Sequence, residues 1–126
     1  MKATAEKTTN PSRIVAAVDL GSNSFHLIIA SLEDNGSLKI IDRIKEMVRL
    51  GAGLNSRNYL NDEIQQRALD CLSRFSQRLQ NIPKKDIRVA GTNTLRIAKN
   101  SNQFIKKARK ILKDWLLILA AVAQKL

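Results

Sequence analysis

The chain has 126 residues, of which 44% are apolar and 26% charged, a balance typical of one globular domain. Its single cysteine excludes an internal disulfide, and no apolar run approaches the roughly 20 residues that a helical membrane span needs. The formal net charge is +11, and the segment from Lys84 to Lys113 holds ten Lys or Arg against one acid. This basic segment predicts a polyanionic partner, with a solvated helix face as the alternative.

The first third of the chain has the pattern of three strands. Residues 1–12 are polar, and we expect a disordered lead-in there. The apolar runs 14–18 and 24–31 are typical of buried strands. The pair Asn35-Gly36 is a strong hairpin signal, so the run 39–45 is predicted to be a third strand, antiparallel to the second.

The rest of the chain alternates helix and strand. A helix is predicted to begin after Asn61, a good N-cap residue. Apolar residues then recur on one helical face, at Ile64, Ala68, Leu72, Phe75 and Leu79. A strand at 86–90, a short helix at 95–99 and a helix from Ser101 or Asn102 to Leu112 follow. The order strand, strand, strand, helix, strand, helix predicts an α/β fold.

The turn between the first two strands has a composition suited to anions. Gly21, Ser22, Asn23 and Ser24 follow Asp19, which ends the first strand. Small residues let a tight turn direct several N–H groups to one point. A carboxylate beside such an anion site needs a cation, so the pairing predicts Mg²⁺ and a phosphorylated ligand. An ordinary hairpin turn is the alternative.

Four patches together resemble the N-terminal domain of the exopolyphosphatase/guanosine pentaphosphatase (Ppx/GppA) family, and its exopolyphosphatase branch in particular. They are the segments 17–26, 49–54, 71–75 and 89–100. The resemblance implies a partial actin/sugar-kinase-like (ribonuclease H-like) α/β domain. In full-length members of the family, two such domains enclose the active site.

The resemblance also implies roles for individual residues. Asp19 is expected to be the Mg²⁺-side carboxylate and, with Arg96, a catalytic residue. Arg49 either reaches phosphate or caps a strand, and His26 is expected to pack on the sheet. The residues expected to bind phosphate are Gly21, Ser22, Asn23, Ser24, Thr92, Asn93 and Thr94.

The resemblance ends near Leu112. A family member would continue into a strand and a Glu-Glu-Ala helix that supplies the candidate general base. Here the run 114–126 is apolar on nearly every side of a helix and has no acid after Asp114. We therefore expect an incomplete phosphatase-like domain over 13–113, truncated before its last strand, and a helical tail outside the family over 114–126. A frameshift or truncation would explain this pattern.

The expected function is that of an N-terminal fragment of an exopolyphosphatase, which in full length hydrolyses terminal phosphate from inorganic polyphosphate with Mg²⁺. A guanosine pentaphosphate phosphatase fragment and a non-catalytic polyanion-binding fragment are the alternatives. Specific nucleic-acid binding is disfavoured, because only 4% of residues are aromatic. The resemblance implies a homodimer for the full-length protein. We expect a cytoplasmic location, with peripheral membrane association at most.

Overall fold

The computed structural model of the chain describes residues 13–91, 93–112 and 117–119. The predicted lead-in at 1–12 and Thr92 lie outside the described residues. A five-stranded sheet in the order β3-β2-β1-β4-β5 forms the base of the fold. Its strands are β1 (Arg13–Leu20), β2 (Phe25–Leu32), β3 (Leu38–Glu46), β4 (Ile87–Gly91) and β5 (Leu117–Leu119).

The sheet is antiparallel on one side and parallel on the other. Strand β2 pairs antiparallel with both β1 and β3, while β4 pairs parallel with β1. The predicted hairpin between β2 and β3 is confirmed, since Gly36 adopts a φ of +88° and its N–H donates to the carbonyl of Glu33. Glycine adopts this backbone conformation without steric cost, which is why the turn forms here.

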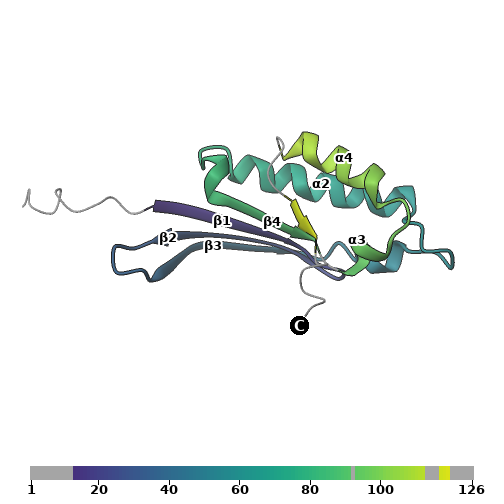
Figure 1. The fold of residues 1–126 in the computed structure, drawn as a ribbon, viewed down its shortest axis with the longest axis horizontal. Helices are drawn as coiled ribbons and strands as arrows, with labels where there is room; N and C mark the ends of the chain where they lie inside the picture. Colours follow the sequence, from purple (N-terminus) through teal and green to yellow (C-terminus); the bar gives the residue numbers. More distant parts are fainter. Residues whose placement is uncertain (1–12, 92, 113–116, 120–126) are drawn as a thin grey trace, which may run out of the picture.

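The helices α2 (Asp62–Arg78) and α4 (Ser101–Ile111) lie on one side of the sheet, and α3 (Asn93–Ile97) lies beyond the carboxyl end of β4 (Figure 1). The predicted N-cap of α2 is confirmed, because the N–H of Ile64 donates to Oδ1 of Asn61 at 2.7 Å. Helix α2 lies between the sheet and α4 (Figure 1). Two short 3₁₀ turns, η1 (Leu50–Gly53) and η2 (Lys84–Asp86), complete the fold.

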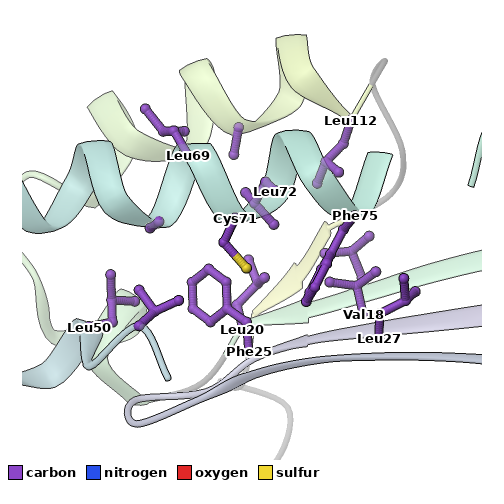
Figure 2. Packing of buried hydrophobic residues seen from close by; sticks show 14 of the residues in the cluster. Val18, Leu20, Phe25, Leu27, Leu50, Leu69, Cys71, Leu72, Phe75 and Leu112 are labelled. Carbon is purple, nitrogen blue, oxygen red and sulfur yellow. The ribbon is translucent and has the colours of Figure 1, made fainter. Parts of the chain in front are cut away.

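The hydrophobic core lies between the sheet and α2. Figure 2 shows Leu72, Cys71 and Phe75 of α2 pointing toward Leu20 and Phe25 of the first two strands, and all five side chains are at most 1% exposed. Successive residues of a strand point to opposite faces. The alternation on β1 therefore turns every second residue away from the helices, toward a face that no described helix covers.

The predicted α/β fold is confirmed, but the prediction for the end of the chain is wrong. We expected a sheet truncated before its last strand and a helical tail over 114–126. Instead Leu117–Leu119 form β5, which pairs parallel with β4. A short apolar run fits a strand and a segment of a buried helix equally well, so its sequence alone does not distinguish the two. The edge of β4 offers backbone hydrogen-bond partners to this run, and pairing with them favours a strand over a helix. The rest of the predicted tail lies outside the described residues.

Within the described ranges, no helix is both long enough and apolar enough to cross a membrane.

Candidate functional site

The candidate site lies at one edge of the sheet, where β1 and β4 end side by side. These strands are parallel, with Asp19 opposite Ala90 and Leu20 opposite Gly91. Both strands therefore deliver the residues that follow them to the same edge. The carboxyl ends of neighbouring parallel strands are the usual place for ligands in α/β sheets.

The first turn is closed by its own backbone. The N–H of Gly21 donates to the carbonyl of Ser24 at 3.1 Å. A Cβ at Gly21 would lie 2.6 Å from that carbonyl oxygen, so the turn requires glycine. The Ser24 side chain is buried, and its hydroxyl lies 3.8 Å from the sulfur of Met47. Ser24 therefore closes the turn, while Ser22 and Asn23 form its more exposed part.

A side-chain hydrogen bond joins the two predicted phosphate turns. The hydroxyl of Thr94 donates to Oγ of Ser22 at 2.6 Å, across 72 residues of sequence. Thr94 is buried and Ser22 is partly exposed. Because the Ser22 oxygen accepts this bond, its own hydroxyl proton is left to donate outward. Gly51 adds a third segment, since its N–H donates to the Ser22 carbonyl at 2.8 Å.

Arg49 enters the site through an unusual backbone conformation. Its φ of 58° and ψ of 48° are left-handed, a region that few residues other than glycine adopt. The Arg49 N–H donates to the carbonyl of Asn23 at 2.8 Å, which fixes this residue beside the first turn. Its side chain is exposed and forms no ion pair within the described part of the chain. A guanidinium in this position is free to meet an anion.

Asp19 and His26 form a pair that the sequence alone did not reveal. They lie opposite each other on β1 and β2, with His26 Nδ1 3.9 Å from Asp19 Oδ2. Both side chains are partly exposed, so His26 lies on the sheet surface beside the predicted metal ligand. The signal was the tight turn at 21–24, because its length fixes the register of the two strands.

The acidic side chains can be tested for their fit to Mg²⁺. Across residues 13–91, 93–112 and 117–119, no group of three or more His, Cys, Asp or Glu is placed to hold a metal ion. Mg²⁺ is commonly held by one or two carboxylates together with substrate phosphates and water. The single exposed carboxylate of Asp19, next to an anion-binding turn, fits that mode of binding and does not fit a metal held by protein ligands alone.

Asn93 and Arg96 lie on α3, directly after the second turn. Both are exposed, and Nη2 of Arg96 donates to Oδ1 of Asn93. This bond holds the guanidinium toward the start of the helix. Thr92, which was also predicted to bind phosphate, lies outside the described residues.

The cysteine does not belong to the site. Burial raises the pKa of the Cys71 thiol to about 12, with the Glu46 carboxylate adding to the effect. The thiol stays protonated at neutral pH and is fully buried in the core. Cys71 is therefore not a nucleophile for this site.

Comparisons with known proteins find matches to this chain in sequence and in fold. The family model described as the Ppx/GppA phosphatase family matches residues 28–119, a range that includes β5. The chain is 50% identical over 106 residues to a guanosine-5'-triphosphate,3'-diphosphate pyrophosphatase of Aliivibrio fischeri (strain ATCC 700601 / ES114). That match covers 84% of this chain and 21% of the relative, so the chain spans about a fifth of the relative's length.

Solved structures show the same fold. A Ppx/GppA family member from Aquifex aeolicus superposes with a TM-score of 0.78 at 22% identity, over 86% of this chain and 35% of that one. An exopolyphosphatase from Cytophaga hutchinsonii superposes with a TM-score of 0.76 at 24% identity, over 85% of this chain and 34% of that one.

Proposed function

Because the chain belongs to the Ppx/GppA phosphatase family, we propose that its two turns bind neighbouring phosphoryl groups at the end of inorganic polyphosphate. The observation that supports this proposal is the hydrogen bond between Thr94 and Ser22, which fixes the two turns against each other. Donors held at a fixed separation suit a ligand whose phosphates repeat along a chain. They also need no reorganisation when the anion arrives.

Each polar residue has a part in this proposal. Backbone N–H groups of the first turn and the Ser22 hydroxyl donate to phosphate oxygens. Asp19 holds Mg²⁺ together with those oxygens, and the ion offsets negative charge on the phosphates. Arg49, beside the first turn, and Arg96, on the helix after the second turn, can each bind two oxygens.

The proposed role of this chain is binding, with hydrolysis of the terminal phosphate occurring in longer proteins that contain the same half-site. The resemblance places the candidate general base in a Glu-Glu-Ala helix that follows the last strand of the domain, apart from the two turns. A positioned general base contributes roughly 10²–10⁴ in rate. We therefore propose that the two turns supply binding and that the rate of hydrolysis depends chiefly on a group outside them.

Guanosine pentaphosphate is the second candidate ligand. The Aliivibrio relative that is 50% identical bears the name of a pyrophosphatase acting on that nucleotide. Both ligands present a linear phosphoanhydride to the turns, and they differ in the nucleoside beyond it. The described residues of the site offer phosphate donors and no aromatic platform for a base.

Calorimetric titration of the full chain tests the proposal. We expect inorganic tripolyphosphate to bind with Mg²⁺ present, and the Ser22→Ala and Asp19→Asn variants to bind at least about tenfold more weakly. Arg49→Ala should weaken binding, while Arg109→Ala on α4 removes the same charge away from the turns and should change it little.

Two outcomes would contradict the proposal. Binding that survives both turn substitutions but is lost in Arg109→Ala would assign the anion site to the basic helix. Tight binding of guanosine pentaphosphate together with none of tripolyphosphate would select the second candidate.

A further inference from the structure

The segment of residues 49–60, here called the bridging loop, connects the two phosphate turns through hydrogen bonds. At its start, the N–H of Arg49 donates to the Asn23 carbonyl and the N–H of Gly51 donates to the Ser22 carbonyl, both at 2.8 Å. At its end, the loop is bonded to the junction between α3 and α4, 40 residues further along the chain. The loop therefore connects the first turn to the helix that follows the second turn.

Asn100, at that junction, holds the end of the bridging loop with both polar atoms of its side-chain amide. The N–H of Leu60 donates to Oδ1 of Asn100 at 2.9 Å, and Nδ2 of Asn100 donates to the Leu60 carbonyl at 3.0 Å. Leu60 is buried and faces Leu54 across an isolated antiparallel bridge, so its own N–H and carbonyl point away from that partner. The amide of Asn100 takes the place that a further strand would have beside Leu60.

This use of Asn100 is unusual for its position in the chain. Asn100 directly precedes α4, where an asparagine ordinarily caps the helix with its side-chain oxygen. The Asn100 side chain forms no capping hydrogen bond to α4, and its oxygen accepts from Leu60 instead. The contact favours a role in placing the bridging loop over a role in starting the helix.

A second hydrogen bond joins the same two segments. The N–H of Lys99 donates to the Asn58 carbonyl at 2.8 Å. Residues 99 and 100 follow α3, which carries Thr94, and the Thr94 hydroxyl donates to Ser22. The hydrogen bonds therefore run from the first turn through the bridging loop to the end of α3, and back along α3 to the first turn. In such a closed circuit, the position of the loop and that of the second turn depend on each other.

The bridging loop is packed tightly enough to transmit a displacement from its end to its start. Leu50 is fully buried, and a Cβ at Gly53 would overlap the side chain of Ile64 on α2. The N–H of Asn61 also donates to the Gly53 carbonyl at 2.9 Å. These contacts hold the middle of the loop against α2, while Lys99 and Asn100 hold its end at α3.

We infer that Asn100 is a positioning residue for the two phosphate turns. By pairing with Leu60 it fixes the bridging loop to the end of α3, and so sets where Arg49 lies relative to Thr94. Its effect on binding rests on the proposed function, because Asn100 itself lies outside the turns. Groups that bind an anion are most effective when their mutual position is fixed before the anion arrives.

The Asn100→Asp variant separates the pairing with Leu60 from a capping role. It keeps the shape of the side chain and an oxygen suited to an N-cap, but it places a second acceptor against the Leu60 carbonyl. Asn100→Ala removes both hydrogen bonds. Ser76→Ala is the matched control, because it removes another bond from a side chain to the backbone, between α2 and Ile111 at the end of α4.

Two measurements on the full chain test the inference. Without ligand, amide hydrogen exchange of Arg49 and Gly51 should be at least about tenfold faster in both Asn100 variants, relative to the amides of β2, and unchanged in Ser76→Ala. With Mg²⁺ present, both Asn100 variants should bind tripolyphosphate at least about threefold more weakly, and Ser76→Ala should bind it as the wild type does. Circular dichroism establishes that the variants are folded.

Three results would overturn the inference. They are unchanged exchange of Gly51 in both Asn100 variants, faster exchange without any loss of tripolyphosphate affinity, and wild-type behaviour of Asn100→Asp beside a loss in Asn100→Ala. The last result would assign Asn100 to the helix cap. Absence of tripolyphosphate binding by the wild-type chain would instead overturn the proposed function, and the exchange of Arg49 and Gly51 would still decide whether Asn100 holds the loop.

Discussion

The two faces of the sheet are built from the same strands and differ in what completes them. Toward the helices, Val18, Leu20 and Leu27 are almost fully buried, and acids of β3 pair with arginines of α2. On the face that points away from the helices, here called the open face, apolar and basic side chains of the same strands are exposed in the described part of the chain. The difference teaches that strand alternation alone does not say which face will be covered, since both faces contain apolar residues.

The largest expected effect is a difference in the free energy of unfolding between a substitution on the covered face and one on the open face. Phe75→Ala removes a fully buried ring from α2, and the loss of contacts plus the cavity should cost about 3–5 kcal/mol. Ile40→Ala removes a side chain that is 44% exposed, and should cost below about 1 kcal/mol. Urea unfolding followed by circular dichroism measures both.

Equal costs for these two variants would contradict the comparison, because they would mean that the open face is buried in solution. An intermediate cost for Ile40→Ala that depends on protein concentration would point to coverage by a second copy.

The second prediction concerns the first turn, at the edge of the sheet that carries the candidate site. Gly21→Ala places a Cβ 2.6 Å from the Ser24 carbonyl oxygen, closer than such contacts occur. The backbone must shift, which should cost about 1–3 kcal/mol and weaken tripolyphosphate binding. In the hairpin at the other end of the sheet, Gly36→Asn meets open space but a φ of +88° that strains side chains, so it should cost about 1 kcal/mol and leave tripolyphosphate binding unchanged.

Thermal unfolding and calorimetry together check this prediction. If Gly21→Ala lost stability without losing affinity, the turn would close the hairpin and play no part in anion binding. That result would favour the ordinary hairpin turn over the phosphate turn.

The sequence was sufficient where local chemistry decides the structure. The N-cap at Asn61 and the turn at Asn35-Gly36 rest on neighbouring residues, and both are confirmed. Leu117–Leu119 is a different case, because an apolar run of that length suits a helix and a strand equally until a free strand edge is known to lie beside it.

The candidate site likewise combines features that depend on neighbouring residues with features that depend on long-range pairing. The sequence singled out Ser22 and Thr94 as residues of two separate turns, but the parallel pairing of β1 and β4 is what brings their hydroxyls together. The nearness of His26 to Asp19 likewise depends on strand register. The direction of the Ser24 hydroxyl, toward Met47, depends on how β2 leaves the turn. Residue types predicted the chemistry, and long-range pairing determined which groups meet.

The third prediction tests whether the edge is held together across the two turns. Thr94→Val keeps the shape of the buried side chain and removes the hydroxyl that donates to Ser22. The loss should cost about 1 kcal/mol, since Ser22 is partly exposed and water can replace the donor. Thr94→Ser retains a hydroxyl and serves as the control.

The affinity of Thr94→Val for tripolyphosphate distinguishes a role in binding from a role in stability alone. A bond that only stabilises the fold would leave the affinity of Thr94→Val unchanged once the protein is folded. We expect the affinity to fall by more than about threefold, because the second turn loses its fixed position relative to the first.

The smallest expected effect concerns the ion pair between Glu46 of β3 and Arg74 of α2, on the covered face of the sheet. Hydrogen bonds from Arg74 hold the pKa of the Glu46 carboxyl below its ordinary value. A carboxylate with a lowered pKa contributes stability above its unfolded pKa, and this contribution is lost as the pH falls through the folded pKa. Glu46→Gln should therefore cost stability at pH 7 and little below about pH 4. The pair is partly exposed, so the cost at pH 7 should stay below about 1 kcal/mol and shrink with added salt.

Urea unfolding from pH 3 to pH 8, in a double-mutant cycle with Arg74→Gln, isolates the coupling between the two side chains. A coupling that did not change with pH would mean that β3 is held to α2 by packing alone. The contrast between a charge-matched covered face and an unmatched open face would then lose its energetic basis.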